Sequence, residues 1–517
     1  MHYRRIGQGP PVVMLHASPA NSAMLAAEMH AAAAHFTCFA LDTPGFGDSD
    51  PRPGESLHVR DLAAATAAAM AALALPPCPV FGTHSGSAIA LELGVLWPDR
   101  VTGLVLDAVP VFTDAEMQDL FKDFFQTFPP DPLGGHFTST WMRFRDQFTW
   151  FPWQSRDATR LNPIHRPAPE DIEHWVMMYY RAMRTYMPAY RAILRYGQEA
   201  KAAAAALTLP AVFLATAEDM LFGHLDRLPP PKPGQRILRL AQDTPAKHAA
   251  IVDCLRAMPQ SPPAPMPVPA GLAGADPAVQ FLDSEDGQLF IRCYGKSENP
   301  ALILLHDAPG TGLALQDLAR GLADAAYVIL PDLPGTGESD APDESRPILE
   351  ACAAAVGAIA DTLAIDSFTI AAIGSGCAVA ALFALQDDPR LTAVLVRDVP
   401  VPDEAAARAI APDIALSPVG AHWLQAWLML RDNQVSRPWY DGAVAAQRRT
   451  QGNFDADWLH DQTFALMASR ETYHRLPRAA YRAASMDLLR RTRIPVTPID
   501  DGELADGIRA AMTPRAT

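Results

Sequence analysis

Short apolar runs alternate with longer, alanine-rich stretches along the first half of the chain. The runs have the length of buried strands, and they span residues 12–15, 36–41, 79–81 and 101–106. The stretches 62–75 and 88–97 have the composition and length of helices. Because strands of a parallel sheet are buried on both faces, they appear as continuous apolar runs. The pattern therefore predicts an α/β fold, with a mostly parallel sheet flanked by helices.

The same pattern returns in the second half of the chain at one constant spacing. The matching segments are 15–19 with 305–309, 42–50 with 332–340, 85–86 with 375–376, and 109–111 with 399–401. About a hundred residues align in this way without a gap, which chance does not produce. The chain is therefore interpreted as a tandem duplication.

A proline-rich segment at residues 259–275 separates the two copies. Proline at this density cannot enter a helix or a central strand, so the segment is predicted to be a semi-rigid linker. We expect one domain over residues 1–258 and a second over 276–517. The second copy opens with a predicted hairpin, 278–294, and the first copy begins at its second arm and so lacks an edge strand.

The apolar run 79–81 turns into the helix 88–97 through small residues, a pattern that lifts one side chain above the sheet. The turn resembles the nucleophile elbow of the α/β-hydrolase family, which reads Gly-x-Ser-x-Gly. With Gly82 and Gly86 in the glycine positions, His84 occupies the nucleophile position and Ser85 falls one residue later. The resemblance implies two tandem α/β-hydrolase-like domains with atypical elbows.

The sequence allows three interpretations of the elbow. Ser85 is the apex of a turn displaced by one residue, or His84 is the apex and acts as base or nucleophile, or the site is inactive.

The family resemblance also implies an acid and a histidine after later strands. Asp219 follows the apolar run 211–215, and His248 lies just before the helix predicted over 249–258. We therefore expect Asp219 and His248 to complete the catalytic group, with Asp107 as a weaker alternative acid.

The stretch His16-Ala17-Ser18-Pro19 resembles the family's His-Gly-x-Pro turn, in which a backbone N–H binds the oxyanion. We assign Ala17 as this donor, and Gly86, the residue after Ser85, as the second. His16 itself is expected to bridge loops or to line the substrate pocket.

Residues 112–200 and 402–485 share a second set of matches at their own constant spacing, such as Trp141 with Trp427. In this family, an insertion at this point is a helical cap over the active site. Trp141, Arg145 and Trp153 are candidate pocket residues, and packing of the cap against the sheet is the alternative role for them.

The second copy is predicted to be non-catalytic. Gly374 occupies its nucleophile position, and no histidine follows His474. The copy also ends before a last strand and helix could deliver a base, so it is predicted to be truncated at its C-terminus. An elbow without a base cannot activate a serine.

Composition limits the binding partners and cofactors that we expect for this protein. The formal charge of −16 argues against nucleic acid and anionic membrane surfaces. Six scattered cysteines fit reduced thiols in the cytoplasm better than a disulfide framework or a metal site. No cofactor motif is recognised, and the glycine-rich turns lack the spacing of a nucleotide site. We expect the copies to pack as an intramolecular pseudo-dimer, and a homo-oligomer is possible.

The sequence therefore predicts a cofactor-independent hydrolase that acts on an ester, amide or activated C–C bond of a small apolar molecule. Two alternatives stay open because one fold hosts many activities. They are a non-catalytic binding or scaffold protein with degenerate sites, and a lyase or cofactor-free oxygenase.

Overall fold

The computed structural model describes residues 1–54, 56–162, 166–241, 244–263, 277–447, 452–499 and 504–512. The chain forms two compact units. Unit 1 contains residues 1–129 and 139–269, and unit 2 contains 130–138 and 270–517. The assignment of 130–138 to unit 2 differs from the domain boundaries expected from the sequence. Most of the predicted linker, 264–275, lies outside the described residues.

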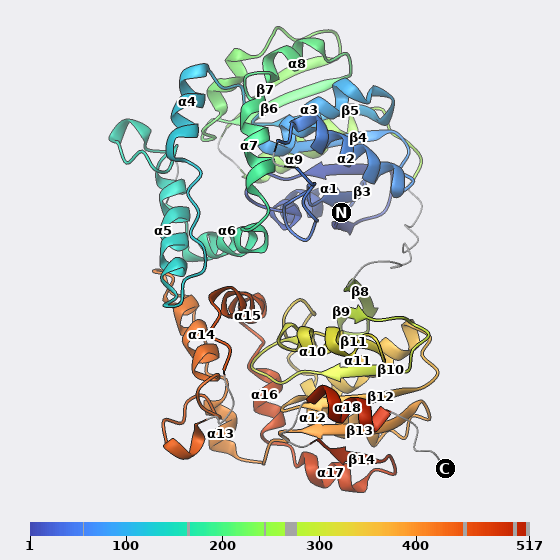
Figure 1. The fold of residues 1–517 in the computed structure, drawn as a ribbon. Coiled ribbons are helices and arrows are strands. Elements are labelled where there is room, and N and C mark those ends of the chain that lie inside the picture. Colours follow the sequence, from blue (N-terminus) through green and yellow to red (C-terminus); the bar gives the residue numbers. More distant parts are fainter. Residues whose placement is uncertain are drawn as a thin grey trace. The chain divides into compact units, whose positions relative to one another are not determined.

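Unit 1 is built on a seven-stranded sheet with the order β1-β3-β2-β4-β5-β6-β7 (Figure 1). The strands are β1 (Tyr3–Ile6), β2 (Pro11–Leu15), β3 (Thr37–Leu41), β4 (Cys78–Thr83), β5 (Val101–Asp107), β6 (Ala211–Thr216) and β7 (Gln235–Leu240). Edge strand β1 runs antiparallel to β3, and the other pairs are parallel. The mostly parallel sheet predicted from the apolar runs is confirmed.

Helices cover both faces of this sheet. They are α1 (Ala26–Ala32), α2 (Val59–Ala72), α3 (Ser85–Leu96), α8 (Ala200–Ala206) and α9 (Thr244–Arg256). Helices α1 and α9 share one apolar cluster with Val12, Met14 and Val105. Helix α3 instead approaches Leu104 through Gly94. Because successive strand residues face opposite sides, α3 lies on the other face from α1 and α9.

Unit 2 has a sheet with the order β14-β13-β12-β10-β11-β9-β8. The strands are β8 (Ala278–Ser284), β9 (Gly287–Tyr294), β10 (Ala301–Leu305), β11 (Tyr327–Pro331), β12 (Phe368–Ile373), β13 (Leu391–Arg397) and β14 (Val496–Pro498). The helices packed on it are α10 (Gln316–Leu322), α11 (Ile348–Thr362), α12 (Gly376–Ala384), α17 (Ser485–Arg491) and α18 (Leu504–Met512).

The ends of the two sheets differ. Strands β8 and β9 form the predicted hairpin, and β9 pairs antiparallel with β11 just as β1 pairs with β3. Strand β8 has no counterpart among the described residues of unit 1. The expected truncation of unit 2 was overstated, because both β14 and α18 are present. Helix α18 packs on α10 as α9 packs on α1, and only a counterpart of β7 is absent from the described part of unit 2.

The inserted segments are helical in both units. Unit 1 contains α4 (Asp114–Asp123), most of α5 (Gly135–Thr149), α6 (Pro169–Ala182) and α7 (Met187–Tyr196), and unit 2 contains α13 (Glu404–Ala409), α14 (Ala421–Asp432), α15 (Ala456–Ala468) and α16 (Arg475–Ala480). Trp153 Nε1 donates to the carbonyl of Phe124 at 3.1 Å, and Trp439 Nε1 donates to that of Ile410 at 2.9 Å. The duplication therefore extends through the insertions. No helix in the described ranges is long and apolar enough to cross a membrane.

The turn from β4 into α3 leaves no space for a side chain at Gly86, where a Cβ would lie 2.1 Å from the carbonyl oxygen of Leu15. We expect Gly86→Ala to lower the free energy of unfolding by about 2 kcal/mol or more, as overpacking against rigid backbone does. Urea denaturation measures this change. Gly223→Ala is the matched control because a Cβ there meets nothing within 4 Å. Equal stability of the two variants would contradict the close approach.

Candidate active site

His84 is the single residue between the strand and the helix of the elbow, and it forms the apex of the turn. Strand β4 ends at Thr83 and α3 begins at Ser85. His84 has φ 48° and ψ −112°, a conformation that side chains rarely adopt and that needs support from its surroundings. Its backbone N–H donates to the carbonyl of Asp107 at 2.8 Å, which ties the turn to β5. Of the two registers left open by the sequence, the structure has the one with His84 at the apex.

The imidazole of His84 pairs with the carboxylate of Asp219, in the loop after β6. Nε2 lies 2.9 Å from Asp219 Oδ2, and the two side chains are 27% and 11% exposed. Burial disfavours the imidazolium, but the Asp219 charge and hydrogen bond outweigh it and raise the pKa of His84 above its ordinary value. Burial likewise opposes ionisation of Asp219, yet His84 lowers that carboxyl's pKa to about 2.

This pairing defines which ring nitrogen is available for chemistry. In the neutral ring, Nε2 carries the proton that it donates to Asp219, and Nδ1 keeps a lone pair. Nδ1 has no hydrogen-bond partner among the residues that the structure describes. The ring can therefore accept a proton at Nδ1 while Asp219 stabilises the resulting charge.

A second ion pair lies beside the first. Lys247, in the first turn of α9, places Nζ 2.7 Å from Oδ2 of Asp107, which also accepts a hydrogen bond from Thr83 Oγ1 at 2.8 Å. Burial opposes the ammonium charge, but the Asp107 carboxylate outweighs this and raises the pKa of Lys247. Asp107, the weaker candidate acid, is thus the counter-ion of a lysine.

The structure does not bring His248 to Asp219. Its Nε2 lies 3.6 Å from Oε1 of Glu28 on α1. Both Lys247 and His248 lie in α9, where one residue corresponds to about 100° of rotation around the axis. The sequence placed a base in the right segment, but Lys247 is the residue turned toward the elbow, and the sequence analysis missed it.

Ser85 lies in the first turn of α3 and is buried. Its Oγ accepts a hydrogen bond from the backbone N–H of Ser18 at 3.0 Å. In the part of the chain that the structure describes, neither His84 nor His248 forms a hydrogen bond with this hydroxyl. Ser85 therefore lacks the adjacent base that an activated serine requires.

Unit 2 shows which backbone groups converge beside the elbow. Oδ1 of Asp307 accepts the N–H groups of Ala308 and Ser375, each at 2.8 Å. The duplication aligns Ala308 with Ser18 and Ser375 with Ser85. The convergent pair in unit 1 is therefore Ser18 and Ser85, one residue away from each donor that the sequence analysis assigned, Ala17 and Gly86. The carbonyl of Ala17 instead accepts from His16 Nδ1 at 2.8 Å.

The elbow of unit 2 is filled by a carboxylate. Its apex, Gly374, has φ 53°, and a Cβ there would lie 2.1 Å from Asp307 Oδ1. Arg437 binds the same carboxylate, with Nη2 2.7 Å from Asp307 Oδ2, and its Nη1 lies 2.9 Å from Asp398. The position that carries His84 in unit 1 thus holds an internal ion pair in unit 2.

His16 is a buried loop bridge. Its Nε2 accepts the N–H of Thr43 at 3.1 Å, and His306 accepts the N–H of Leu333 in the same way. Burial lowers the pKa of His16, which keeps the ring neutral and able to accept this bond. His16 therefore holds the loop that carries Ser18 against the loop after β3.

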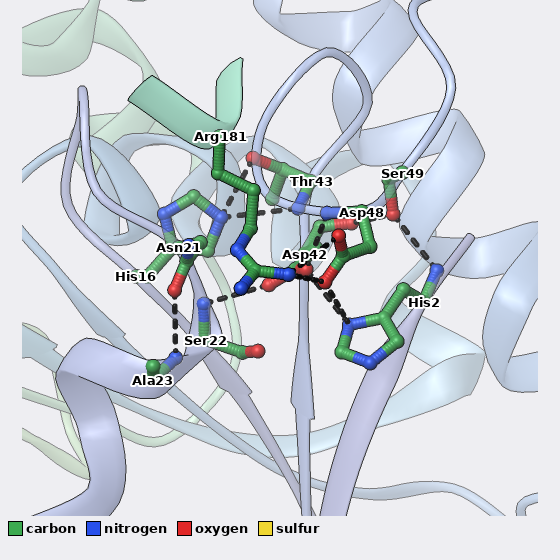
Figure 2. A network of polar contacts seen from close by, with 10 residues as sticks. All are labelled: His2, His16, Asn21, Ser22, Ala23, Asp42, Thr43, Asp48, Ser49 and Arg181. Carbon is green, nitrogen blue, oxygen red and sulfur yellow. Dashed lines mark hydrogen bonds and ion pairs between the residues drawn. The ribbon is translucent and has the colours of Figure 1, made fainter. Parts of the chain in front are cut away.

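Figure 2 shows the polar network below this bridge. Asp42 accepts from Ser22 N–H at 2.7 Å and Asp48 N–H at 2.9 Å, and it pairs with His2 Nδ1 at 2.8 Å. Arg181 from α6 pairs with Asp48 at 2.9 Å. The ligand atoms of His2, Asp42 and Asp48 are close enough for a metal ion, and each of the three side chains already has a hydrogen-bond or ion-pair partner. The cluster anchors loops.

The candidate pocket residues of the insertion differ in their solvent exposure. Trp141 and Trp153 are buried, whereas Arg145 is exposed. The buried arginine of α5 is Arg143, two positions earlier, which the sequence analysis did not identify.

The raised pKa of His84 has a direct test. We expect Asp219→Asn to lower the imidazole pKa, because burial stays and the carboxylate that outweighs it is lost. A pH titration of the His84 ring by NMR measures the shift. His224 is the control: burial lowers its pKa to about 4, so its titration should stay well below that of His84. An unchanged His84 pKa in the variant would contradict the pairing.

The chain matches one protein-family model and shows partial similarity to known proteins. The model of the alpha/beta hydrolase fold family matches residues 10–243 and 300–486. An uncharacterized hydrolase of Saccharomyces cerevisiae is 29% identical over 118 residues, which cover 23% of this chain and 41% of that protein. A pimeloyl-(acyl-carrier protein) methyl ester esterase of Aeromonas salmonicida is 33% identical over 102 residues, which cover 20% and 38%. The matches thus span less than half the length of either relative.

Two solved structures have low sequence identity to this chain. An esterase from Thermogutta terrifontis is 18% identical with a TM-score of 0.36, and covers 49% of this chain and 92% of its own. Epoxide hydrolase A from Mycobacterium thermoresistibile is 19% identical with a TM-score of 0.38, and covers 50% and 95%. The family model matches both halves and, together, well over half of the residues. The protein therefore belongs to the α/β-hydrolase fold family and contains two copies of that fold.

Proposed function

We propose that the protein is a hydrolase whose unit 1 cleaves an ester of a small, fairly apolar molecule, with His84 as general base. The observation that carries this proposal is the His84–Asp219 pair at the apex of the elbow. The names of the relatives, a hydrolase and a methyl ester esterase, agree with the reaction class. Cleavage of an amide or of an activated C–C bond is the alternative reaction.

In the proposed reaction, Nδ1 of His84 removes a proton from a water molecule as its oxygen attacks the ester carbonyl. Asp219 stabilises the imidazolium that forms. The carbonyl oxygen becomes an oxyanion, and the N–H groups of Ser18 and Ser85 bind it. The imidazolium then returns the proton to the leaving alcohol as the C–O bond breaks. No acyl-serine is formed.

The Ser85 hydroxyl has a specific place in this proposal. It accepts the Ser18 N–H at 3.0 Å, so it occupies a donor that the oxyanion needs. Substrate binding must therefore rotate the hydroxyl away.

Unit 2 is proposed to be non-catalytic. Asp307 already accepts both backbone donors, and the negative charge of a carboxylate repels a developing oxyanion. With glycine at position 374, the elbow of this unit has no imidazole, and the carboxylate beside it, Asp307, is paired with Arg437.

Three substitutions distinguish attack by water, with His84 as base, from attack by the Ser85 hydroxyl. We expect His84→Ala to lower kcat/KM for p-nitrophenyl esters by about two orders of magnitude or more. Ser85→Ala should keep activity at the wild-type level or above, because it frees the Ser18 N–H. Ser375→Ala is the matched control at the equivalent position of unit 2 and should be silent. Loss of turnover in Ser85→Ala with activity kept in His84→Ala would contradict the proposal and restore the serine route.

The pH profile provides a second test. The imidazole acts as a base only when neutral, and Asp219 raises its pKa above the ordinary 6.5. We therefore expect kcat/KM to increase with pH through a midpoint above 6.5. In Asp219→Asn the midpoint should move to lower pH, with a lower plateau because the imidazolium loses its counter-charge. A profile that is flat from pH 5 to 9 would exclude His84 as the base.

A further inference from the structure

Arg143 on α5 is a buried cation enclosed by aromatic rings. Its guanidinium carbon lies 4.6 Å from the ring centroid of Phe144, 5.5 Å from that of Tyr179 and 5.6 Å from that of Trp153. The residue is 2% exposed. Its Nε and Nη1 are buried and have no hydrogen-bond partner within the described ranges. All of these residues belong to unit 1.

The described residues provide no carboxylate as a partner for this arginine. It forms no ion pair with any carboxylate of the described chain, and Asp146, one turn along α5, pairs with Arg156 at 2.7 Å. Burial raises the pKa of Tyr179 and of Tyr190, so both phenols stay neutral. Burial of an unpaired charge with unsatisfied donors is costly, and ring faces compensate only part of that cost.

The second copy shows that packing does not require a charge here. The constant spacing that aligns Trp141 with Trp427 and Trp153 with Trp439 also aligns Arg143 with Met429. Met429 is also buried, at 3% exposure. An apolar side chain of similar length therefore fills the same position in a homologous helix. A purely structural role leaves the charge and the open donors of Arg143 unexplained.

We propose that Arg143 binds the carboxylate of a small organic ligand, with the surrounding rings as the apolar wall for the rest of the molecule. Guanidinium donors match carboxylate oxygens, and burial among rings strengthens the charge-assisted bonds. The ligand class is an aromatic or aliphatic carboxylic acid. This inference goes beyond the proposed ester hydrolysis and does not depend on His84.

The rings also connect this site to the elbow region. Tyr179 contacts Tyr186 at 5.6 Å between centroids, Tyr186 contacts Phe46 at 6.3 Å, and Phe46 contacts His16 at 5.4 Å. His16 in turn holds the loop that carries Ser18. The carboxylate is therefore either part of the substrate or belongs to a separate effector that acts through these packed rings.

Binding of benzoate tests the site, with benzamide as its uncharged analogue. Benzoate should raise the melting temperature of the wild type and quench its tryptophan fluorescence, and benzamide should do neither. Arg143→Met, the residue found in the second copy, should weaken benzoate binding by about tenfold or more. Its melting temperature without ligand should equal or exceed that of the wild type, because an unpaired buried charge is removed. Arg145→Met is the control at an exposed arginine of the same helix and should bind benzoate normally.

Equal benzoate affinity in wild type and Arg143→Met, or no binding by the wild type, would overturn the proposal. Arg143→Met that fails to fold would also overturn it, because the charge would then be structural. His84→Ala should still bind benzoate, so failure of the catalytic proposal is distinguished from failure of this one. Competitive inhibition of ester turnover by benzoate would assign the carboxylate to the substrate, and non-competitive inhibition or activation would assign it to an effector.

Discussion

The turn between β4 and α3 depends on a backbone approach that only glycine permits. A Cβ at Gly82 would lie 2.4 Å from the carbonyl oxygen of Gly86, and one at Gly86 would lie 2.1 Å from that of Leu15. This contact forces the chain to reverse at residue 84, in a conformation with positive φ. The side chain at the apex is thereby lifted toward Asp219, while the N–H of the next residue starts the helix.

The two copies show how one backbone supports opposite electrostatics. In unit 1 the apex carries an imidazole, and the serine hydroxyl beside it is a neutral acceptor for Ser18 N–H. In unit 2 the apex has no side chain, and the Asp307 carboxylate takes both backbone donors and the Arg437 guanidinium. Equivalent backbone N–H groups therefore face a neutral hydroxyl in unit 1 and an ion-paired carboxylate in unit 2.

The fold could be predicted from the sequence because its signals are local and repeated. Apolar runs, turn residues and the duplicated motifs each predicted the mostly parallel sheets. The segment that holds Asp219 was also predicted, because the acid follows directly after a strand.

Single-residue assignments in the site were harder to predict. A strand-to-helix turn has no periodicity, so the choice between His84 and Ser85 needed backbone dihedral angles. Lys247 and His248 are neighbours in sequence but point in different directions from α9, and their positions depend on helix phase. Arg143 gave only a weak signal, because burial of a charge among rings depends on contacts with Tyr179 of α6 and with Trp153, which lies beyond the end of α5. Its alignment with Met429 was the one available indication, since a change from methionine to arginine at an otherwise matching helix is unusual for a buried position.

The Asp307 carboxylate also limits how the second unit can change in evolution. A side chain added at Gly374 would collide with it, since the new Cβ would lie 2.1 Å from its Oδ1. Removal of Asp307 alone would leave Arg437 without one of its two counter-ions. The three positions are therefore coupled: a side chain at Gly374 requires a change at Asp307, and a change at Asp307 alters the ion pairs of Arg437. The duplicated fold thus presents an imidazole at the apex of one copy and excludes any side chain from the apex of the other.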